Sequence, residues 1–229
     1  MDSHNQTLTC LLGDPVDHSV SDVMFQYFAQ IAGVDNYNHL KFRISNTDTK
    51  NLETAMQALR VLGFAGANIT LPYKESAIEY LDSIDDVAKR MGAVNTVVHK
   101  NGLLIGYNTD GTGAIKAIES QSRPICKSDK VLILGAGGAA RAIIASLADK
   151  VDNITVLNRN SDIARAIKLK NDFVNLTSAI EVKPLSDENI ISSLENANIV
   201  INATPVGMYP NSNSSLVNKK HIDSLTLFT

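Results

Sequence analysis

Short apolar runs alternate with amphipathic segments along the whole chain, and turn residues separate them. Apolar runs and two-residue alternation predict strands, while apolar residues every three or four positions predict helices. Strands are predicted within 7–14, 38–44, 64–70, 95–100, 103–108, 153–160, 179–186, 198–208 and 224–229, with a further strand and helix within 130–150. Helices are predicted at 22–33, 49–63, 75–91 (broken near Ser83), 111–122, 161–173 and 188–196. This alternation is typical of βαβ units and predicts an α/β fold.

Local signals mark the ends of several elements. Ser21 is expected to cap the helix that follows it, whereas Ser19 is not needed for capping. Pro72 cannot donate to a sheet and is expected to end the preceding strand. Asn101 and Gly102 predict a two-residue type I′ hairpin, which would form an antiparallel edge on a mostly parallel sheet.

The pattern restarts after the polar connection 121–129. We therefore expect an N-terminal, mostly parallel α/β domain at 1–120 and a Rossmann-type domain at 121–229. A doubly wound sheet normally has further strands and helices after this point, so the second domain is expected to be incomplete at its C-terminus.

Composition narrows the class of protein. Apolar residues make up 44% of the chain, charged residues 20%, and the net charge is −3. Basic residues never form a block longer than a pair such as Lys219-Lys220, so neither nucleic acid nor a membrane is expected as a partner. With no long apolar window and no signal-peptide pattern, the chain is expected to be cytoplasmic. Cys10 and Cys126 are far apart, and we expect reduced thiols and no metal site.

The stretch VLILGAGGAARA carries the pattern G-x-G-x-x-A on Gly135, Gly137 and Ala140. It follows a predicted strand and opens a predicted helix, the context in which small residues bring a pyrophosphate close to a helix N-terminus. The alternative is a glycine-rich turn without a ligand. An NAD site would place an acidic residue at the end of the next strand, but this chain has Asn158, Arg159 and Asn160 there, which favours NADP over NAD. The alternative is a solvated loop arginine, and nearby Asp162 is expected to cap the next helix.

Several motifs of the first half are unremarkable when taken singly. Ser19 and Ser21 have the spacing to bond a polyol or carboxylate, yet capping alone would explain them. Asn95 and Asp110, each leaving one arm of the predicted hairpin, fit ordinary turn chemistry.

The motifs GDPVDHSVS, GANITLPYKE, GAVNT, GYNTDG, GAGGAAR, NRN and NATPVGM occur in this order and together resemble the shikimate dehydrogenase family. Members interconvert 3-dehydroshikimate and shikimate with NADPH, and the similarity runs from Leu8 to Thr229. It implies a substrate-binding catalytic first domain, an NADP-binding second domain, and a monomer or homodimer. The implied catalytic pair is Lys74 and Asp110. The implied substrate contacts are Ser19, Ser21, Asn68, Thr70 and Asn95, and the implied cofactor contacts are Gly135, Gly137, Gly138, Ala139, Asn158, Arg159, Thr204 and Met208.

A lysine suits this reaction because reduction of a ketone leaves negative charge on its oxygen, where an ammonium can stabilise it and deliver a proton. Closing a cleft around Lys74 would lower its pKa and Asp110 would raise it, and the sequence leaves that balance open. Asp110 could orient the lysine, bond a substrate hydroxyl, or both.

The chain departs from the family pattern at Asp22, Phe25 and Asn160, where members usually carry proline, histidine and a hydroxyl residue. The family also continues beyond the point where this sequence stops, including a glutamine that touches substrate and a final helix. We therefore expect the 229-residue chain to be destabilised and weakly active. Alternatives are a dual quinate/shikimate dehydrogenase and a non-catalytic metabolite sensor of the same fold; intact Lys74 and Asp110 disfavour the sensor.

Overall fold

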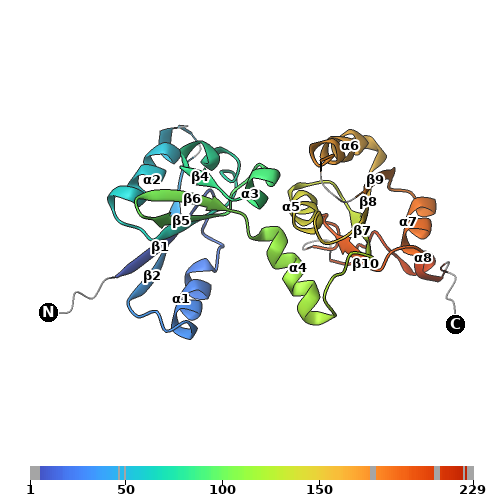
Figure 1. Ribbon diagram of the computed structural model, residues 1–229, viewed down its shortest axis with the longest axis horizontal. Helices are drawn as coiled ribbons and strands as arrows, with labels where there is room; N and C mark the ends of the chain where they lie inside the picture. Colours follow the sequence, from blue (N-terminus) through green and yellow to red (C-terminus); the bar gives the residue numbers. More distant parts are fainter. Residues whose placement is uncertain are drawn as a thin grey trace. The chain divides into compact units, whose positions relative to one another are not determined.

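The computed structural model describes residues 6–45, 47–48, 50–175, 179–208, 212–223 and 225 (Figure 1). They fall into two compact units, 1–109 and 110–229. Each unit combines parallel strands with helices, which confirms the predicted α/β class.

The first unit contains a six-stranded sheet in the order β2-β1-β3-β5-β6-β4. Its strands are β1 (Thr7–Gly13), β2 (Tyr37–Arg43), β3 (Gly66–Ile69), β4 (Ser83–Ile84), β5 (Thr96–Lys100) and β6 (Leu103–Tyr107). β1 is parallel to β2 and β3, and β5 is antiparallel to both β3 and β6. Asn101 and Gly102 have φ of 54° and 77°, as a type I′ turn requires, so the hairpin prediction is confirmed.

The hairpin does not form the edge of the sheet, which corrects the prediction. The segment predicted as a broken helix contains a 3-10 turn, η1 (Ser76–Tyr80), then β4, then the short helix α3 (Asp86–Met91). β4 pairs in parallel with β6 and so occupies the edge itself. Next to it, Asp82 accepts a hydrogen bond from Leu104 N at 2.6 Å and pairs with Arg60 at 2.8 Å, which holds this short strand in register.

Helices lie on both faces of the first sheet. The main core packs β1, β3, β5 and β6 against α2 (Lys50–Val61) through residues such as Leu12, Met56 and Leu104, all at most 2% exposed. Neighbouring residues of a strand point to opposite faces. Thr9 and its partner His39 therefore face α1 (Ser21–Ile31), whose Phe25 stacks on His39 with ring centroids 4.6 Å apart.

The second unit contains a four-stranded parallel sheet in the order β10-β7-β8-β9. Its strands are β7 (Lys130–Leu134), β8 (Asn153–Asn158), β9 (Ala179–Pro184) and β10 (Ile199–Asn202). Its helices are α4 (Asp110–Gln121), α5 (Gly138–Leu147), η2 (Asn160–Asp162), α6 (Ile163–Asp172), α7 (Asp187–Leu194) and α8 (Lys219–Asp223). Apart from Leu225, the strand predicted at 224–229 lies outside the described residues.

The helix α4 packs tightly on α5. A Cβ added at Gly111 would lie 2.0 Å from the carbonyl oxygen of Ala142, so only glycine permits this approach. The carboxylate of Glu119 accepts from Ile125 N at 3.2 Å and pairs with Lys150 at 3.1 Å. These contacts group α4 with the second unit, whereas the sequence-based boundary lay at 120/121.

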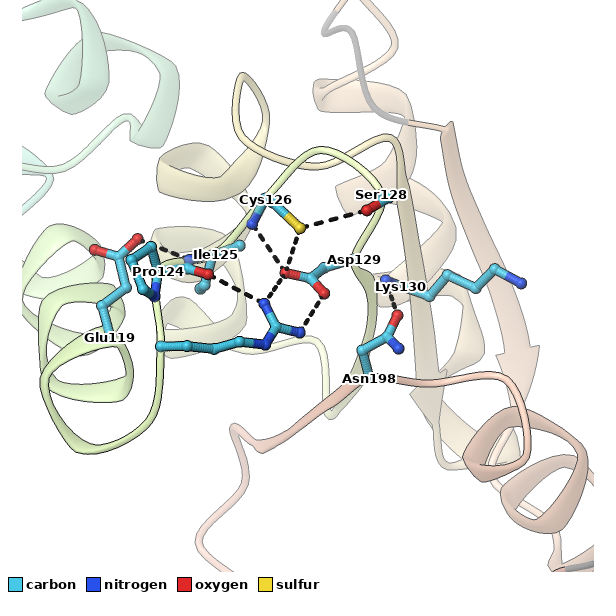
Figure 2. Close-up of polar contacts among 9 residues, drawn as sticks. Glu119, Pro124, Ile125, Cys126, Ser128, Asp129, Lys130 and Asn198 are labelled. Carbon is cyan, nitrogen blue, oxygen red and sulfur yellow. Dashed lines mark hydrogen bonds and ion pairs between the residues drawn. The ribbon is translucent and has the colours of Figure 1, made fainter. Parts of the chain in front are cut away.

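The loop from α4 to β7 is organised around one buried carboxylate, that of Asp129 (Figure 2). Arg123 donates to both of its oxygens, at 2.6 and 2.8 Å, and Cys126 N donates to it at 2.9 Å. The hydrogen bonds from Arg123 and, to a smaller extent, the hydrogen bond from Cys126 N hold the pKa of Asp129 well below its usual range, although burial opposes this shift. Beside it, Lys130 N donates to Asn198 Oδ1 at 2.9 Å, which ties the start of β7 to the segment before β10.

Within the described residues, no helix is both long and apolar enough to cross a bilayer. The same part of the chain contains no group of three or more histidine, cysteine or acidic residues arranged to hold a metal ion. Cys10 and Cys126 are free thiols, and burial raises the pKa of Cys10 to about 12.

Candidate active site

The predicted substrate residues of the first unit gather at one edge of its sheet. Ser19 and Ser21 follow β1, Asn68 and Thr70 lie at the end of β3, and Asn95 directly precedes antiparallel β5. The register pairs Leu12 with Ile69 and Asn68 with Thr96, so these strand ends are neighbours. Open α/β sheets bind ligands outside the carboxyl ends of their strands, where these side chains lie.

The two serines have the opposite roles from those predicted. Ser21 N donates to Ser19 Oγ at 3.2 Å, so Ser19 supports the start of α1. Ser21 is the first helical residue, and its hydroxyl makes no capping bond because Val20 occupies the cap position. The Ser21 hydroxyl is instead buried without a hydrogen-bond partner among the described residues. A buried hydroxyl left in this state is costly unless a ligand satisfies it.

Lys41, on β2, holds the turn that carries both serines. Its Nζ donates to the carbonyl of Ser19 at 2.8 Å and lies 3.3 Å from the carboxylate of Asp22. Although desolvation opposes it, the hydrogen bonds from Val23 and Lys41 lower the pKa of Asp22. At two of the three departures from the family pattern, therefore, Asp22 gains an ion pair and Phe25 gains the stack on His39.

The side chain of Asn95 forms hydrogen bonds with Thr96 and Thr109. Its Oδ1 accepts from Thr109 N at 3.0 Å and from Thr96 Oγ1 at 2.9 Å, and its Nδ2 donates to Thr109 Oγ1 at 3.0 Å. Asn95 is buried, and its side chain forms hydrogen bonds with Thr109, the residue immediately before Asp110. Thr109, which sequence analysis did not single out, is thereby held at both its backbone N–H and its hydroxyl by the Asn95 side chain.

Lys74 lies on a short loop whose backbone is anchored on both sides. Tyr73 N donates to Thr70 O at 3.0 Å, and the Tyr73 hydroxyl donates to Ile44 O at 2.6 Å. The carbonyl of Lys74 accepts from Val94 N at 2.7 Å. β3 ends at Ile69, before Pro72, as predicted, and the partly buried Lys74 follows on this anchored loop.

Asn68 and Thr70 differ in how firmly the protein holds them. Thr70 N donates to Leu12 O at 2.9 Å, which extends the pairing of β1 and β3 by one residue. The Asn68 Nδ2 atom lies 3.4 Å from Asn95 O and 3.5 Å from Thr96 Oγ1, both long for hydrogen bonds. Protein contacts therefore restrain the Asn68 side chain only weakly.

In the second unit, the glycine-rich turn joins β7 to α5. Gly135 has a φ of +101°, and a Cβ there would lie 2.6 Å from Thr204 Cγ2, so the turn requires glycine. A Cβ added at Gly137 or Gly138 would meet nothing within 4 Å. Ala140 is fully buried, as the third small residue of the motif should be. The first turn of α5 thus borders open space.

A cavity of about 440 Å³ opens beside this turn. Of the predicted cofactor residues, five line it, namely Gly135, Gly137, Asn158, Arg159 and Thr204. Gly138, Ala139 and Met208 are not among the residues that line the cavity. Gly138 and Ala139 are exposed at the start of α5, and Met208 is exposed after β10.

The loop after β10 is shaped by one asparagine, Asn202. Its Oδ1 accepts from Thr204 N at 3.0 Å and from the Thr204 hydroxyl at 2.7 Å, and its Nδ2 donates to Val206 O at 2.9 Å. These bonds hold Thr204 against Gly135 in the wall of the cavity. Asn202 was not predicted, although it opens the motif NATPVGM.

Two further charged residues line the cavity beside Arg159. Asp162 was expected to cap α6, but its side chain makes no capping bond; its Oδ2 lies 3.7 Å from Arg159 Nη2. Arg165, in the first turn of α6, also lines the cavity. A glycine turn with open space at its second glycine, two guanidinium groups and apolar walls fits a dinucleotide.

Known protein families match both units. The family model described as the shikimate dehydrogenase substrate binding domain matches residues 11–97, and that described as shikimate / quinate 5-dehydrogenase matches 117–226. The NADP(+) shikimate dehydrogenase of Methanococcus maripaludis strain C7 is 41% identical over 203 residues, which cover 89% of this chain and 69% of that protein. The chain belongs to the shikimate dehydrogenase family.

Solved structures of shikimate dehydrogenases resemble the chain closely. The Listeria monocytogenes enzyme, in complex with shikimate and NAD, is 32% identical with a TM-score of 0.85, over 93% of this chain and 74% of that one. The Thermus thermophilus enzyme, in complex with NADP(H) and shikimate, is 30% identical with a TM-score of 0.76, over 94% of this chain and 75% of that one.

Proposed function

We propose that this chain catalyses the reversible, NADP-dependent reduction of 3-dehydroshikimate to shikimate. The observation that carries the proposal is the match of both units to shikimate dehydrogenase domains, together with a 41% identical relative named as NADP(+)-dependent. The bound nicotinamide would supply the hydride. The chain itself would bind the substrate and the cofactor, orient them and transfer one proton.

Lys74 is the group we assign to that proton. As an ammonium, it would donate a hydrogen bond to the ketone oxygen, stabilise the charge that develops there and transfer its proton. In the oxidation of shikimate, the neutral amine would accept the proton of the hydroxyl. The anchored backbone of residues 73 and 74 supports this role, because a general acid must be held within hydrogen-bond reach of its target.

Asp110 is the second catalytic residue in this proposal. We assign it to orient the lysine, to accept a hydrogen bond from a substrate hydroxyl, or to do both. It is the first residue of α4 and directly follows Thr109, which Asn95 holds through three hydrogen bonds. We therefore treat Asn95 mainly as a positioning residue for this segment.

The substrate hydroxyls and carboxylate would bind to Ser19, Ser21, Asn68 and Thr70. The buried Ser21 hydroxyl, which has no hydrogen-bond partner in the part of the chain that the structure describes, supports a direct contact most strongly. Ser19, whose hydroxyl already accepts a bond from Ser21 N, retains its own proton to donate. Arg159 and Asn158 would hold the adenosine end of the cofactor, and the turn from Gly135 to Gly138 and Ala139 would hold its pyrophosphate. Thr204 and Met208 would adjoin the nicotinamide.

A spectrophotometric assay tests the function. The proposal predicts that the chain forms NADPH from NADP only when shikimate is present. Quinate in place of shikimate, and NAD in place of NADP, are assayed in parallel for comparison. Turnover of quinate at a comparable rate would favour a dual quinate/shikimate enzyme, which the description of the matched family includes. Binding of shikimate and NADP without any turnover would favour a metabolite sensor and contradict the proposal.

A further inference from the structure

Three charged residues of the cofactor cavity come from one short stretch of the chain. Arg159 precedes η2, Asp162 ends η2, and Arg165 lies in the first turn of α6. All three line the cavity. Asp162 Oδ2 lies 3.7 Å from Arg159 Nη2, while Arg165 has no ion pair with any residue that the structure describes. Arg159 and Asp162 therefore offset each other, and Arg165 supplies the unbalanced positive charge.

This arrangement bears on which nucleotide the cavity prefers. NADP differs from NAD by a phosphate on the 2′-oxygen of the adenosine ribose. A guanidinium binds that phosphate strongly, whereas a carboxylate repels it and accepts a hydrogen bond from a free 2′-hydroxyl. The cavity contains both kinds of group, so its preference depends on their balance and not on Arg159 alone.

Exposure decides how Arg159 and Asp162 contribute. The Arg159 side chain is 72% exposed, and an ion pair that exposed is weak and screened by salt. Arg159 can therefore leave Asp162 at little cost and bond a phosphate. The carboxylate of Asp162, whose side chain is 35% exposed, remains in the cavity wall. There its negative charge repels a bound 2′-phosphate.

We propose that Arg165 is a specificity-determining residue that confers the preference for a 2′-phosphate, and that Asp162 limits this preference. The proposal deepens the proposed function, since it rests on a dinucleotide occupying this cavity. Its consequence is a site that prefers NADP but still accepts a nucleotide lacking the phosphate.

The test compares two fragments that differ only in the 2′-phosphate, namely 2′,5′-ADP and 5′-AMP, titrated by calorimetry. Arg165→Gln should weaken 2′,5′-ADP by roughly tenfold or more and leave 5′-AMP nearly unchanged, because a charge-assisted hydrogen bond is lost. Asp162→Asn should strengthen 2′,5′-ADP. Lys170→Gln removes the same charge from α6 at a residue outside the cavity lining and should change neither affinity.

Each outcome supports or contradicts the proposal. An equal 2′,5′-ADP affinity in the Arg165→Gln and Lys170→Gln proteins would overturn it, and so would a parent chain that binds neither fragment. If Arg165→Gln does not fold, Arg165→Lys should give an intermediate affinity, since it keeps the charge and loses the planar fork. These fragments bind without substrate, so predicted affinities with no shikimate oxidation would refute the proposed reaction and leave this inference standing.

Discussion

The backbone N–H of Ser21 donates to the hydroxyl of Ser19 at 3.2 Å, while the hydroxyl of Ser21 is buried with no partner among the described residues. Ser19 thus supports the start of the helix in addition to its proposed substrate contact, whereas Ser21 is assigned to the substrate alone. Because the two roles lie two residues apart, two matched alanine substitutions separate them.

Ser19→Ala should reduce stability by about 0.5–2 kcal/mol, the usual cost of losing a side-chain acceptor at a helix start. Ser21→Ala should leave stability unchanged or raise it slightly, because it removes a buried unsatisfied hydroxyl. Shikimate affinity should instead fall by roughly tenfold in Ser21→Ala. Thermal denaturation and shikimate titration measure the two effects. A Ser21→Ala protein that loses stability but binds shikimate normally would show that Ser21 has a structural role only.

Gly135 and Gly137 give a second matched pair. Gly135→Ala places a side chain at φ +101° and 2.6 Å from Thr204 Cγ2, and should cost about 1–3 kcal/mol of stability. Gly137→Ala, at φ −86° with nothing within 4 Å, should fold normally and weaken NADP binding. Melting temperature and NADP titration distinguish them. Unchanged NADP affinity in Gly137→Ala would argue against phosphate approaching the turn.

His39 should make stability depend on pH in the mildly acidic range. Burial lowers its pKa below 6.5, and the nearby charge of Asp22 opposes that shift only partly. Since the unfolded imidazole binds a proton at a higher pH than the folded one, stability should fall as the pH drops below about 6.5. His39→Gln should flatten the stability profile between about pH 7 and pH 5. Urea denaturation at a series of pH values measures the slope, and an unchanged slope in His39→Gln would contradict this role.

The buried carboxylate of Asp129 (Figure 2) should be important for the stability of the second unit. Asp129→Ala removes the acceptor of hydrogen bonds from Arg123 and Cys126 N, and we expect a loss of roughly 1.5–3 kcal/mol. Ser128→Ala, which loses only a contact with the Cys126 thiol, is the matched control and should lose far less. Urea denaturation checks both variants, and equal midpoints would refute the importance of Asp129.

Periodicity was enough to predict the regular strands and helices. Two turns could also be predicted, namely the glycine-rich turn after β7 and the type I′ hairpin between β5 and β6. Both require backbone conformations that few residues other than glycine and asparagine adopt. β4 has two residues, which is too short for any periodicity to appear. Its position depends on the pairing of Asp82 with Leu104 and Arg60, which the sequence pattern does not reveal.

The candidate site could be predicted only in part, for a similar reason. The residue types at the strand ends were readable, and the structure brings Ser19, Ser21, Asn68, Thr70 and Asn95 to one sheet edge. Which serine supports the start of α1 depends on the backbone at Val20, which occupies the cap position. Asp162 lies near Arg159 and does not cap α6. Arg165 was missed because its place in the cavity wall follows from the start and phase of α6.

The most direct test of the proposed reaction is shikimate-dependent NADPH formation by this chain and by its Lys74→Ala variant. We predict measurable NADPH formation by the chain, a rate at least about a hundredfold lower for the variant, and equal NADP affinity in both, because Lys74 is assigned to proton transfer. The same rate in both proteins would contradict the role of Lys74. No turnover by the parent chain, although it binds shikimate and NADP, would contradict the proposed activity itself.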